Sequence, residues 1–188
     1  MPTAGWWETL WPKPALVLEA VGLKRNMNAV DLCCGDGWFT SEMAKVARRV
    51  VAIDIDRNML DVARDRLTKA GTTNCELVEG DAYDTTLADM PVDFVFMANA
   101  FHGVPNQPRL AQTVHKTLKS GGRFAVVNWH QRPREETTIL GEPRGPKTGL
   151  RMSPGQTIES VEAGGLIFAE LVELPPYHYA VIFERSSP

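Results

Sequence analysis

The sequence predicts an α/β fold: a doubly wound, mostly parallel sheet of seven strands that ends in an antiparallel hairpin. Short apolar runs alternate with segments of helical periodicity along most of the chain, a pattern typical of a parallel sheet with helices on both faces. The last two predicted strands are joined only by Pro175-Pro176. Two residues cannot form a right-handed crossover, so these two strands must run antiparallel.

The predicted strands are short runs rich in valine, isoleucine and phenylalanine, bounded by glycine, proline or polar residues. In chain order they span residues 28–33, 50–55, 75–78, 92–97, 123–129, 167–174 and 177–184. A turn at Ser120-Gly121-Gly122 separates the fifth strand from the helix before it.

The predicted helices carry apolar residues every three or four positions. Pro14 suits the start of the first helix, and Gly71 suits the end of the third. In chain order the helices span residues 14–23, 39–47, 58–70, 109–118 and 154–163.

The composition is that of a globular domain, with 188 residues, 44% hydrophobic and 23% charged, and a net charge of -3. We predict one domain over residues 1–188, with an N-terminal cap segment at 1–25 and a surface loop at 131–153 that is rich in proline and glycine. Because the net charge is slightly negative, neither nucleic acid nor an anionic membrane is an expected partner.

The chain carries no apolar stretch long enough to span a bilayer, and residues 1–11 lack the pattern of a signal peptide. Cys33, Cys34 and Cys75 form neither a metal-binding motif nor a regular disulfide framework. We therefore expect no metal, reduced thiols and a cytoplasmic location without integral membrane contact.

Glycines and carboxylates follow successive predicted strands. The loop at 31–37 reads Asp-Leu-Cys-Cys-Gly-Asp-Gly, Asp54 ends the second strand, and Asp81-Ala82 follows the third. Glycines let a backbone approach a ligand closely, and ligands of open α/β sheets bind at the carboxyl ends of the strands. Each of these features alone is also explained as a helix cap or a turn. Their joint occurrence, with one feature after each successive strand, favours a nucleotide-type ligand.

Four segments resemble the motifs of the class I S-adenosylmethionine (SAM)-dependent methyltransferases, in the group that includes the ubiquinone/menaquinone C-methyltransferases. They are Val-Asp-Leu-Cys-Cys-Gly-Asp-Gly at 30–37, Val-Ala-Ile-Asp-Ile-Asp at 51–56, Glu-Gly-Asp-Ala at 79–82 and Leu-Lys-Ser-Gly-Gly-Arg at 118–123. The resemblance covers residues 15–129 well and the last third only in outline. It implies the Rossmann-like fold of this family, SAM as cofactor and a small-molecule acceptor.

The resemblance also implies the residues that contact SAM. Asp31 and the Cys33 carbonyl would meet its amino group, Asp54 would hold the ribose, and Ile55 would pack on the adenine, whose edge would meet Asp81-Ala82. The full predicted set is Asp31, Cys33, Gly35, Gly37, Asp54, Ile55, Asp81, Ala82 and Asn99.

The loop departs from the family pattern at one residue, and it leaves one other cofactor to consider. Cys33 stands where the family usually has glycine, and we interpret it as a tolerated variation whose β-carbon points away from the ligand, and not as a nucleophile. A nicotinamide enzyme is an alternative, but its GxGxxG fingerprint meets Gly35 and Gly37 and then Thr40 in the third place.

The reacting end of the site is less defined. His102 and His130 follow the fourth and fifth strands, and each either accepts a proton near neutral pH or caps a loop. A base is needed only when the acceptor carries a proton that must leave. Other aromatic residues either bind ligand or cover the sheet; they are Trp6, Trp7, Trp11 and Tyr177-His178-Tyr179.

The sequence therefore predicts transfer of a methyl group from SAM to a small-molecule acceptor by in-line displacement. A homodimer would complete a site that is otherwise shallow. Two alternatives stay open: a SAM-binding sensor or partner protein without catalysis, and an NAD-dependent oxidoreductase.

Overall fold

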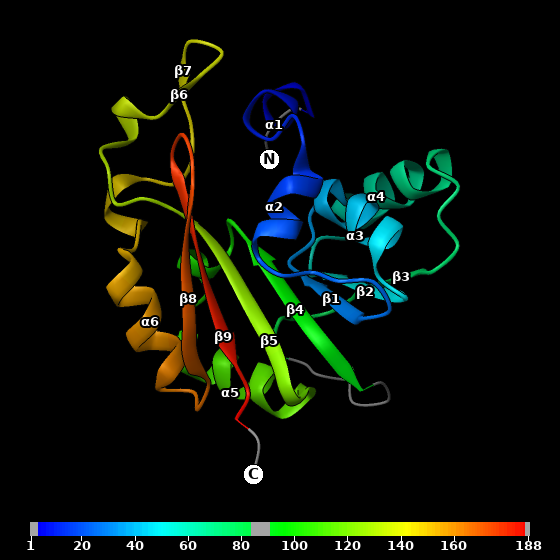
Figure 1. Cartoon of the computed structure of the whole chain (residues 1–188). Coiled ribbons are helices and arrows are strands. Elements are labelled where there is room, and N and C mark those ends of the chain that lie inside the picture. Colours follow the sequence, from blue (N-terminus) through cyan, green and yellow to red (C-terminus); the bar gives the residue numbers. More distant parts are fainter. Residues whose placement is uncertain (1–3, 84–90, 187–188) are drawn as a thin grey trace.

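A computed structural model describes residues 4–83 and 91–186, so the first three residues of the predicted N-terminal cap segment lie outside it. The centre of the fold is a seven-stranded sheet of order β3-β2-β1-β4-β5-β9-β8, shown in Figure 1. Its strands are β1 (Asn28–Leu32), β2 (Arg49–Asp54), β3 (Cys75–Glu79), β4 (Val92–Ala98), β5 (Leu118–Trp129), β8 (Ile167–Leu174) and β9 (His178–Glu184).

The pairing directions confirm the predicted topology. Strands β1 to β5 pair parallel with their neighbours, whereas β9 runs antiparallel to both β5 and β8. Strand order reverses between β1 and β4, so the loops that follow these two strands diverge at the switch point where such sheets bind ligands. Trp129 of β5 pairs with His178 of β9, which places the start of the last strand at this same edge.

Helices cover both faces of the sheet (Figure 1). One buried cluster joins α1, α2 and α3 to one face, and a second cluster joins α5 and α6 to the other. The helices are α1 (Ala4–Leu10), α2 (Pro14–Ala20), α3 (Trp38–Val46), α4 (Arg57–Lys69), α5 (Gln107–Thr117) and α6 (Pro154–Glu162).

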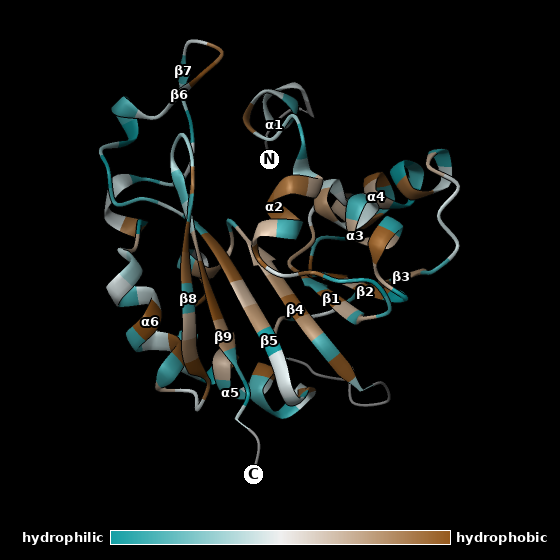
Figure 2. Cartoon of the chain, viewed as in Figure 1, coloured by the Kyte–Doolittle hydropathy of each residue, from teal (hydrophilic) through white to brown (hydrophobic). Residues whose placement is uncertain are grey.

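Strand β5 shows how alternate residues of a strand enter the cores on opposite faces of the sheet. Ala125, Val127 and Trp129 enter the cluster on the α1–α3 side, and Phe124 and Val126 enter the cluster on the α5–α6 side. Alternate side chains of a strand point to opposite faces, so a run that is apolar at every position is buried on both. Figure 2 shows the hydrophobic residues concentrated in these central strands.

Helix α1 has no counterpart in the sequence prediction. Its seven residues include Gly5 and two tryptophans, which are weak helix formers. Trp6 and Leu10 are four positions apart, and both are buried in the core cluster. Packing of this one face against the sheet therefore stabilises a helix that its propensity alone would not.

Two predicted irregular segments are more ordered than expected. The predicted turn at 120–122 lies inside β5, where the pairing shifts between Val92 and Phe94 of β4. The predicted surface loop at 131–153 contains a short hairpin of β6 (Thr138–Ile139) and β7 (Glu142–Pro143), together with the 3-10 turns η3 (Arg134–Glu136) and η4 (Thr148–Leu150). Long-range side-chain contacts order this loop, as described below.

Among the described residues, each helix is too short or too polar to cross a lipid bilayer.

Candidate functional site

A cavity of about 290 Å³ lies at the carboxyl edge of the sheet, between the ends of β1, β2 and β4. We call it the loop cavity. Three carboxylates line it, and among the described residues no lysine or arginine does, so its lining is acidic. The lining residues are Trp7, Asp31, Cys33, Cys34, Gly35, Asp36, Trp38, Phe39, Asp54, Ile55, Met59, Ala98, Asn99 and Ala100.

The backbone of the loop after β1 is turned sharply around this cavity. Cys33 and Gly35 both adopt the left-handed conformation, with φ of 60° and 54°. A non-glycine residue tolerates this conformation only at a cost in strain, which explains why glycine is usual at the position of Cys33. The Cys33 side chain packs partly against the core on the α5–α6 side, and Cys33 also lines the cavity, so the orientation of its β-carbon away from a ligand stays a prediction.

Asp54 connects the loop to the end of β2. The side chain is buried, and its two carboxylate oxygens accept hydrogen bonds from the backbone N–H of Gly35 at 2.8 Å and of Asp56 at 2.9 Å. Each carboxylate oxygen has two acceptor sites. Asp54 can therefore hold the loop and still accept from a hydroxyl in the cavity.

Asp31 is the most deeply buried carboxylate of the loop cavity, with 3% of its surface exposed. The hydroxyl of Thr40 on α3 donates to it at 2.5 Å. The pKa of Asp31 is raised to about 7: burial is the main cause, the Thr40 hydrogen bond opposes it, and the charges of Asp54 and Asp36 add to it. A cation bound beside Asp31 would favour its charged form.

The two cysteines of the loop are poor nucleophiles. Burial raises the pKa of Cys33 to about 12, and it raises the pKa of Cys34 still more. The reactive form of cysteine is the thiolate, so both groups stay as neutral thiols at physiological pH.

Gly37 serves packing and does not line the cavity. Its φ is 74°, and a β-carbon there would lie 2.9 Å from the β-carbon of Ala63. This glycine therefore lets the start of α3 approach α4 closely. Asp81 and Ala82 also lie outside the cavity lining, although Asp81 is near enough to raise the pKa of Cys33.

Asn99 lies just after β4 with a φ of 59°. Both polar atoms of its side-chain amide are buried and have no hydrogen-bond partner among the described residues. Unpaired buried amides are costly. This amide is therefore positioned to bind a ligand.

A second cavity, of about 420 Å³, adjoins the first and shares Trp7 and Asn99 with it. We call it the tryptophan cavity. It combines three indole rings with two guanidinium groups, and no carboxylate of the described ranges 4–83 and 91–186 lines it. Its lining residues are Trp6, Trp7, Asn99, His102, Trp129, Arg134, Arg144, Gly145 and Pro146.

The indole rings come from distant parts of the chain. Trp6 stacks on Trp7 with ring centroids 4.1 Å apart, and lies 6.4 Å from Trp129 of β5. Trp11 has a different role, because it is buried in the core beside Phe39 and His178. The N-terminal tryptophans thus divide between lining a cavity and covering the sheet.

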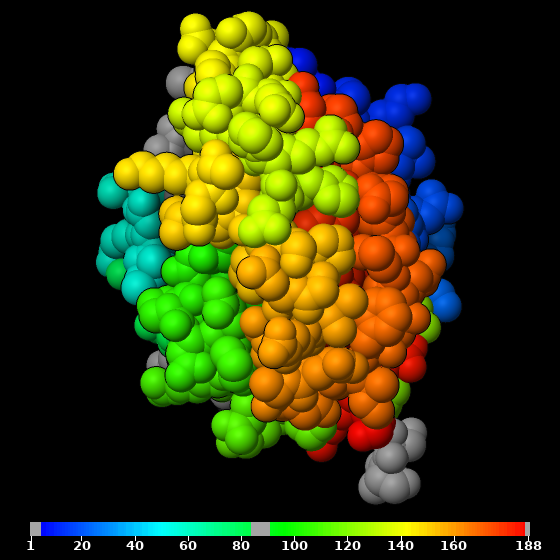
Figure 3. All heavy atoms as spheres, turned by 90° about the vertical axis from the view of Figure 1, so that its left-hand side faces the viewer, coloured from blue at the N-terminus to red at the C-terminus, as the bar shows by residue number. Residues whose placement is uncertain are grey.

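Residues 134–151, which we call the roof segment, cover the tryptophan cavity. In Figure 3 this segment forms the yellow mass at the upper end of the face made by α6 and β8. Arg151 organises it: the buried guanidinium donates to the Thr137 hydroxyl at 2.8 Å and to the carbonyls of Arg144 at 3.0 Å and Pro146 at 3.2 Å. It also lies 5.1 Å from the ring centroid of Trp129.

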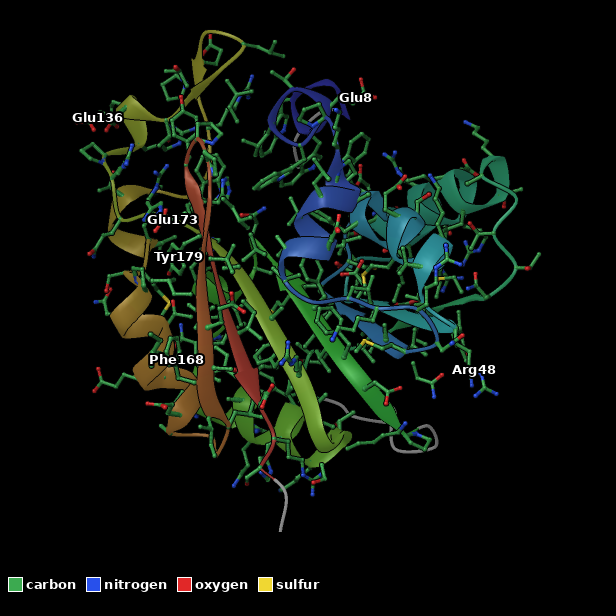
Figure 4. All side chains as sticks on the ribbon, viewed as in Figure 1. Glu8, Arg48, Glu136, Phe168, Glu173 and Tyr179 are labelled. Carbon is green, nitrogen blue, oxygen red and sulfur yellow. The ribbon has the colours of Figure 1, made fainter. Side chains whose placement is uncertain are left out.

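The candidate histidines have separate environments. His102 lines the tryptophan cavity; burial lowers its pKa, and the positive charge of Arg151 lowers it further. His130 lines neither cavity, and its Nε2 lies 2.8 Å from the carboxylate of Glu173 on β8. Figure 4 shows Glu173 beside Tyr179 of β9, whose ring centroid is 5.1 Å from that of His130.

Sequence reasoning did not identify several residues of the loop cavity. Trp38 and Met59 line it, and Arg66 of α4 lies 4.9 Å from the centroid of the Trp38 ring and pairs with Asp36 at 3.0 Å. The signal for Met59 was present, because it follows the Asp54 motif by one helical turn. Nothing local pairs Arg66 with Asp36, since they are thirty positions apart.

A larger hollow of about 720 Å³ lies at the opposite, amino edge of the sheet, lined by residues such as Asn28, Arg49 and Lys119. None of the predicted site residues lines it. Because ligands of open α/β sheets bind at the carboxyl edge, the functional site is better assigned to the two adjoining cavities.

Comparisons with known proteins identify the family of the chain. A demethylmenaquinone methyltransferase of Listeria monocytogenes is 29% identical over 124 residues, which are 64% of this chain and 52% of that protein. The Staphylococcus aureus protein of that name is 31% identical over 118 residues, 61% of this chain and 48% of its own length. The chain thus spans about half the length of these curated relatives.

Solved structures share the fold. A SAM-dependent methyltransferase from Aquifex aeolicus superposes with a TM-score of 0.84 at 24% identity, over 97% of this chain and 94% of its own. The [4+2]-cyclase SpnF superposes with a TM-score of 0.77 at 16% identity, over 93% and 81%. The predicted Rossmann-like fold is therefore confirmed.

The family model described as a methyltransferase domain matches residues 30–126, from the first predicted motif to the fifth strand. This match covers more than half of the chain and confirms the resemblance on which the predicted SAM cofactor rests. The chain belongs to the methyltransferase domain family.

Proposed function

We propose that this protein transfers a methyl group from SAM, held in the loop cavity, to a small molecule held in the tryptophan cavity. The observation that carries the proposal is that the two cavities share Trp7 and Asn99. Two ligands on either side of these residues would be neighbours, and neighbouring, aligned reactants are what a displacement reaction requires.

The residues of the loop cavity fit the cofactor. The carboxylates suit a ligand with an ammonium group, a sulfonium and ribose hydroxyls, and the unpaired Asn99 amide supplies a donor and an acceptor. Asp31 would face the ammonium group and Asp54 the ribose. Ile55 is 71% exposed beside Asp54, an unusual exposure for isoleucine that an adenine ring would cover.

When bound, SAM supplies a methyl group on a sulfonium that is already activated, so alignment and exclusion of water are the main tasks of the protein. Trp7 and Asn99 separate the two cavities and would orient both ligands. The roof segment and α1 would exclude water from above the tryptophan cavity. No protein nucleophile is required, which agrees with the neutral thiols of the loop.

His102 is the base that we propose for acceptors that must lose a proton. Its lowered pKa keeps the imidazole neutral above the ordinary value of 6.5, so it can accept a proton at neutral pH. With SAM saturating, so that Asp31 is held in its charged form, we expect kcat/KM for the acceptor to fall with acid only below pH 6.5, as His102 becomes protonated. His102→Gln should remove this acidic limb and lower kcat by about 100-fold or more.

The matched control is His115→Gln, because His115 lies on α5 and lines neither cavity. The measurement is a pH profile of methyl transfer together with calorimetry of S-adenosylhomocysteine. An acidic limb that persists in His102→Gln would exclude this histidine as the base.

Calorimetry with SAM, followed by a screen for S-adenosylhomocysteine release, tests the proposed function as a whole. We expect SAM to bind and NAD not to bind, and we expect product release with at least one small acceptor. The fold alone does not decide this, because a [4+2]-cyclase shares it. SAM binding with no turnover across phenols, thiols, amines and quinols would favour the sensor alternative.

The curated relatives are named for methylation of demethylmenaquinone, so a quinol is one acceptor for this screen. We also propose one domain over the whole chain, a cytoplasmic location and a homodimer. The exposed apolar side chains Ile167, Phe168 and Leu171 of the edge strand β8 support the proposed homodimer. Sedimentation velocity measures whether two copies associate.

A further inference from the structure

The two adjoining cavities carry opposite charges. In the part of the chain that the structure describes, three aspartates and no lysine or arginine line the loop cavity, whereas two arginines and no carboxylate line the tryptophan cavity. A site that holds a cationic methyl donor and a neutral acceptor would need the acidic cavity but not the basic one. The segregation of charge therefore points to an anionic ligand in the tryptophan cavity.

The arginines of this cavity have no carboxylate partner. Among the described residues, neither Arg134 nor Arg144 takes part in an ion pair. Within the described part of the chain, the Arg134 guanidinium donates only to the carbonyls of Gly145 at 3.1 Å and Pro143 at 3.0 Å. The Nε of Arg144 is buried without a hydrogen-bond partner.

The acidic side chains of η3 and α1 do not supply the missing partner. Glu135 and Glu136 of η3 are exposed, as is Glu8 of α1, and none of the three lines the cavity. Figure 4 shows Glu136 on the outer side of the roof segment, away from α1. Arg134 and Arg144 of the roof segment thus line the cavity, whereas Glu136 lies away from it and the charge of Glu135 acts on Arg151.

The lining also selects the shape of the ligand. The indole rings of Trp6, Trp7 and Trp129 surround the arginines with aromatic surface, which favours a flat ring over an extended chain. The planar guanidinium fork matches a carboxylate, with two parallel hydrogen bonds.

We propose that the acceptor is an aromatic carboxylate whose ring packs among the tryptophans and whose anion binds Arg134 and Arg144. This inference rests on the proposed function, because it names the class of molecule that receives the methyl group. It separates this protein from an enzyme for a neutral quinol, since a neutral ring would leave the buried donor of Arg144 unpaired.

Calorimetry with 1-naphthoate and 1-naphthamide tests the proposal, because the two probes share ring and shape and differ in charge. Titrations are made with and without S-adenosylhomocysteine. We expect naphthoate to bind at least about tenfold more tightly than the amide, and the neutral quinone menadione to bind no better than the amide. Equal affinities, or binding of neither probe up to millimolar concentration, would overturn the proposal.

Variants assign the preference to the arginines. Arg144→Met should reduce the ratio of the two affinities towards one, with amide binding unchanged as a sign that the cavity is intact. Arg134→Met should also reduce the ratio, but it removes two hydrogen bonds of the roof segment, so amide hydrogen exchange over residues 134–150 checks that the segment stays in place. Arg132→Met is the control, because Arg132 is exposed and lines neither cavity. A preference that persists in both cavity variants would contradict the assignment.

The same titrations distinguish the two levels of inference. Failure of S-adenosylhomocysteine to bind would overturn the proposed function, whatever the probes do. Normal S-adenosylhomocysteine binding without a preference for naphthoate would overturn only the aromatic carboxylate.

Discussion

Asp54→Ala is expected to weaken binding of S-adenosylhomocysteine by roughly 100-fold, because each charge-assisted hydrogen bond contributes about 1.5–3 kcal/mol and 1.4 kcal/mol is a tenfold change. The substitution removes the acceptor that holds the backbone N–H of Gly35 at 2.8 Å and of Asp56 at 2.9 Å. The loop would lose its anchor to β2, and the ribose would lose its proposed partner.

Isothermal titration calorimetry of the wild type and the variant measures this loss, and a thermal melt without ligand checks that both are folded. Asp65→Ala is the matched control, because Asp65 is an exposed carboxylate on α4 that lines neither cavity. An affinity of Asp54→Ala within about threefold of the wild type, well under 1 kcal/mol, would show that Asp54 does not bind the ribose.

Arg151→Met is expected to release the roof segment while leaving the rest of the fold in place. Methionine keeps an unbranched side chain against Trp129 but removes three hydrogen bonds, to the Thr137 hydroxyl and to the carbonyls of Arg144 and Pro146. A charged donor contributes about 1.5–3 kcal/mol per hydrogen bond. The segment should therefore open at least about 30-fold more often, which corresponds to roughly 2 kcal/mol.

Amide hydrogen exchange resolved along the chain measures this opening. We expect faster exchange over residues 134–150 and unchanged exchange in β1, β4 and β5. Lys147→Met is the control within the same segment, because Lys147 is exposed. Unchanged exchange in the roof segment of Arg151→Met would mean that the buried guanidinium does not hold it.

Proline at positions 143 and 146 and glycine at 141, 145 and 149 suggested only a loop for this segment. In the structure the segment is ordered by packing, as Gly145 shows: a β-carbon at this position would lie 2.8 Å from the Trp129 ring. Its φ is 84°, a conformation that favours glycine. The contacts that order the segment thus join residues that no local pattern connects.

The sequence alone determined the seven strands of the main sheet, their directions and the loop after β1. These features depend on local chemistry: apolar runs form buried strands, glycines permit left-handed turns, and a two-residue link forces antiparallel pairing. The placement of Asp31 and Asp54 at one edge followed from this, because parallel strands end together.

Only the tertiary structure decided which side chains meet. It brought Trp6 and Trp7 to Trp129 and assigned Gly37 to packing against Ala63. It also placed His102 in the lining of the tryptophan cavity and left His130 out of both cavities. These outcomes depend on packing between segments that are far apart in sequence, where the free energy comes from burial and from satisfying polar groups. The positive charge of the tryptophan cavity is an example. It comes from arginines of the roof segment, for which the local sequence pattern predicts only a solvated surface.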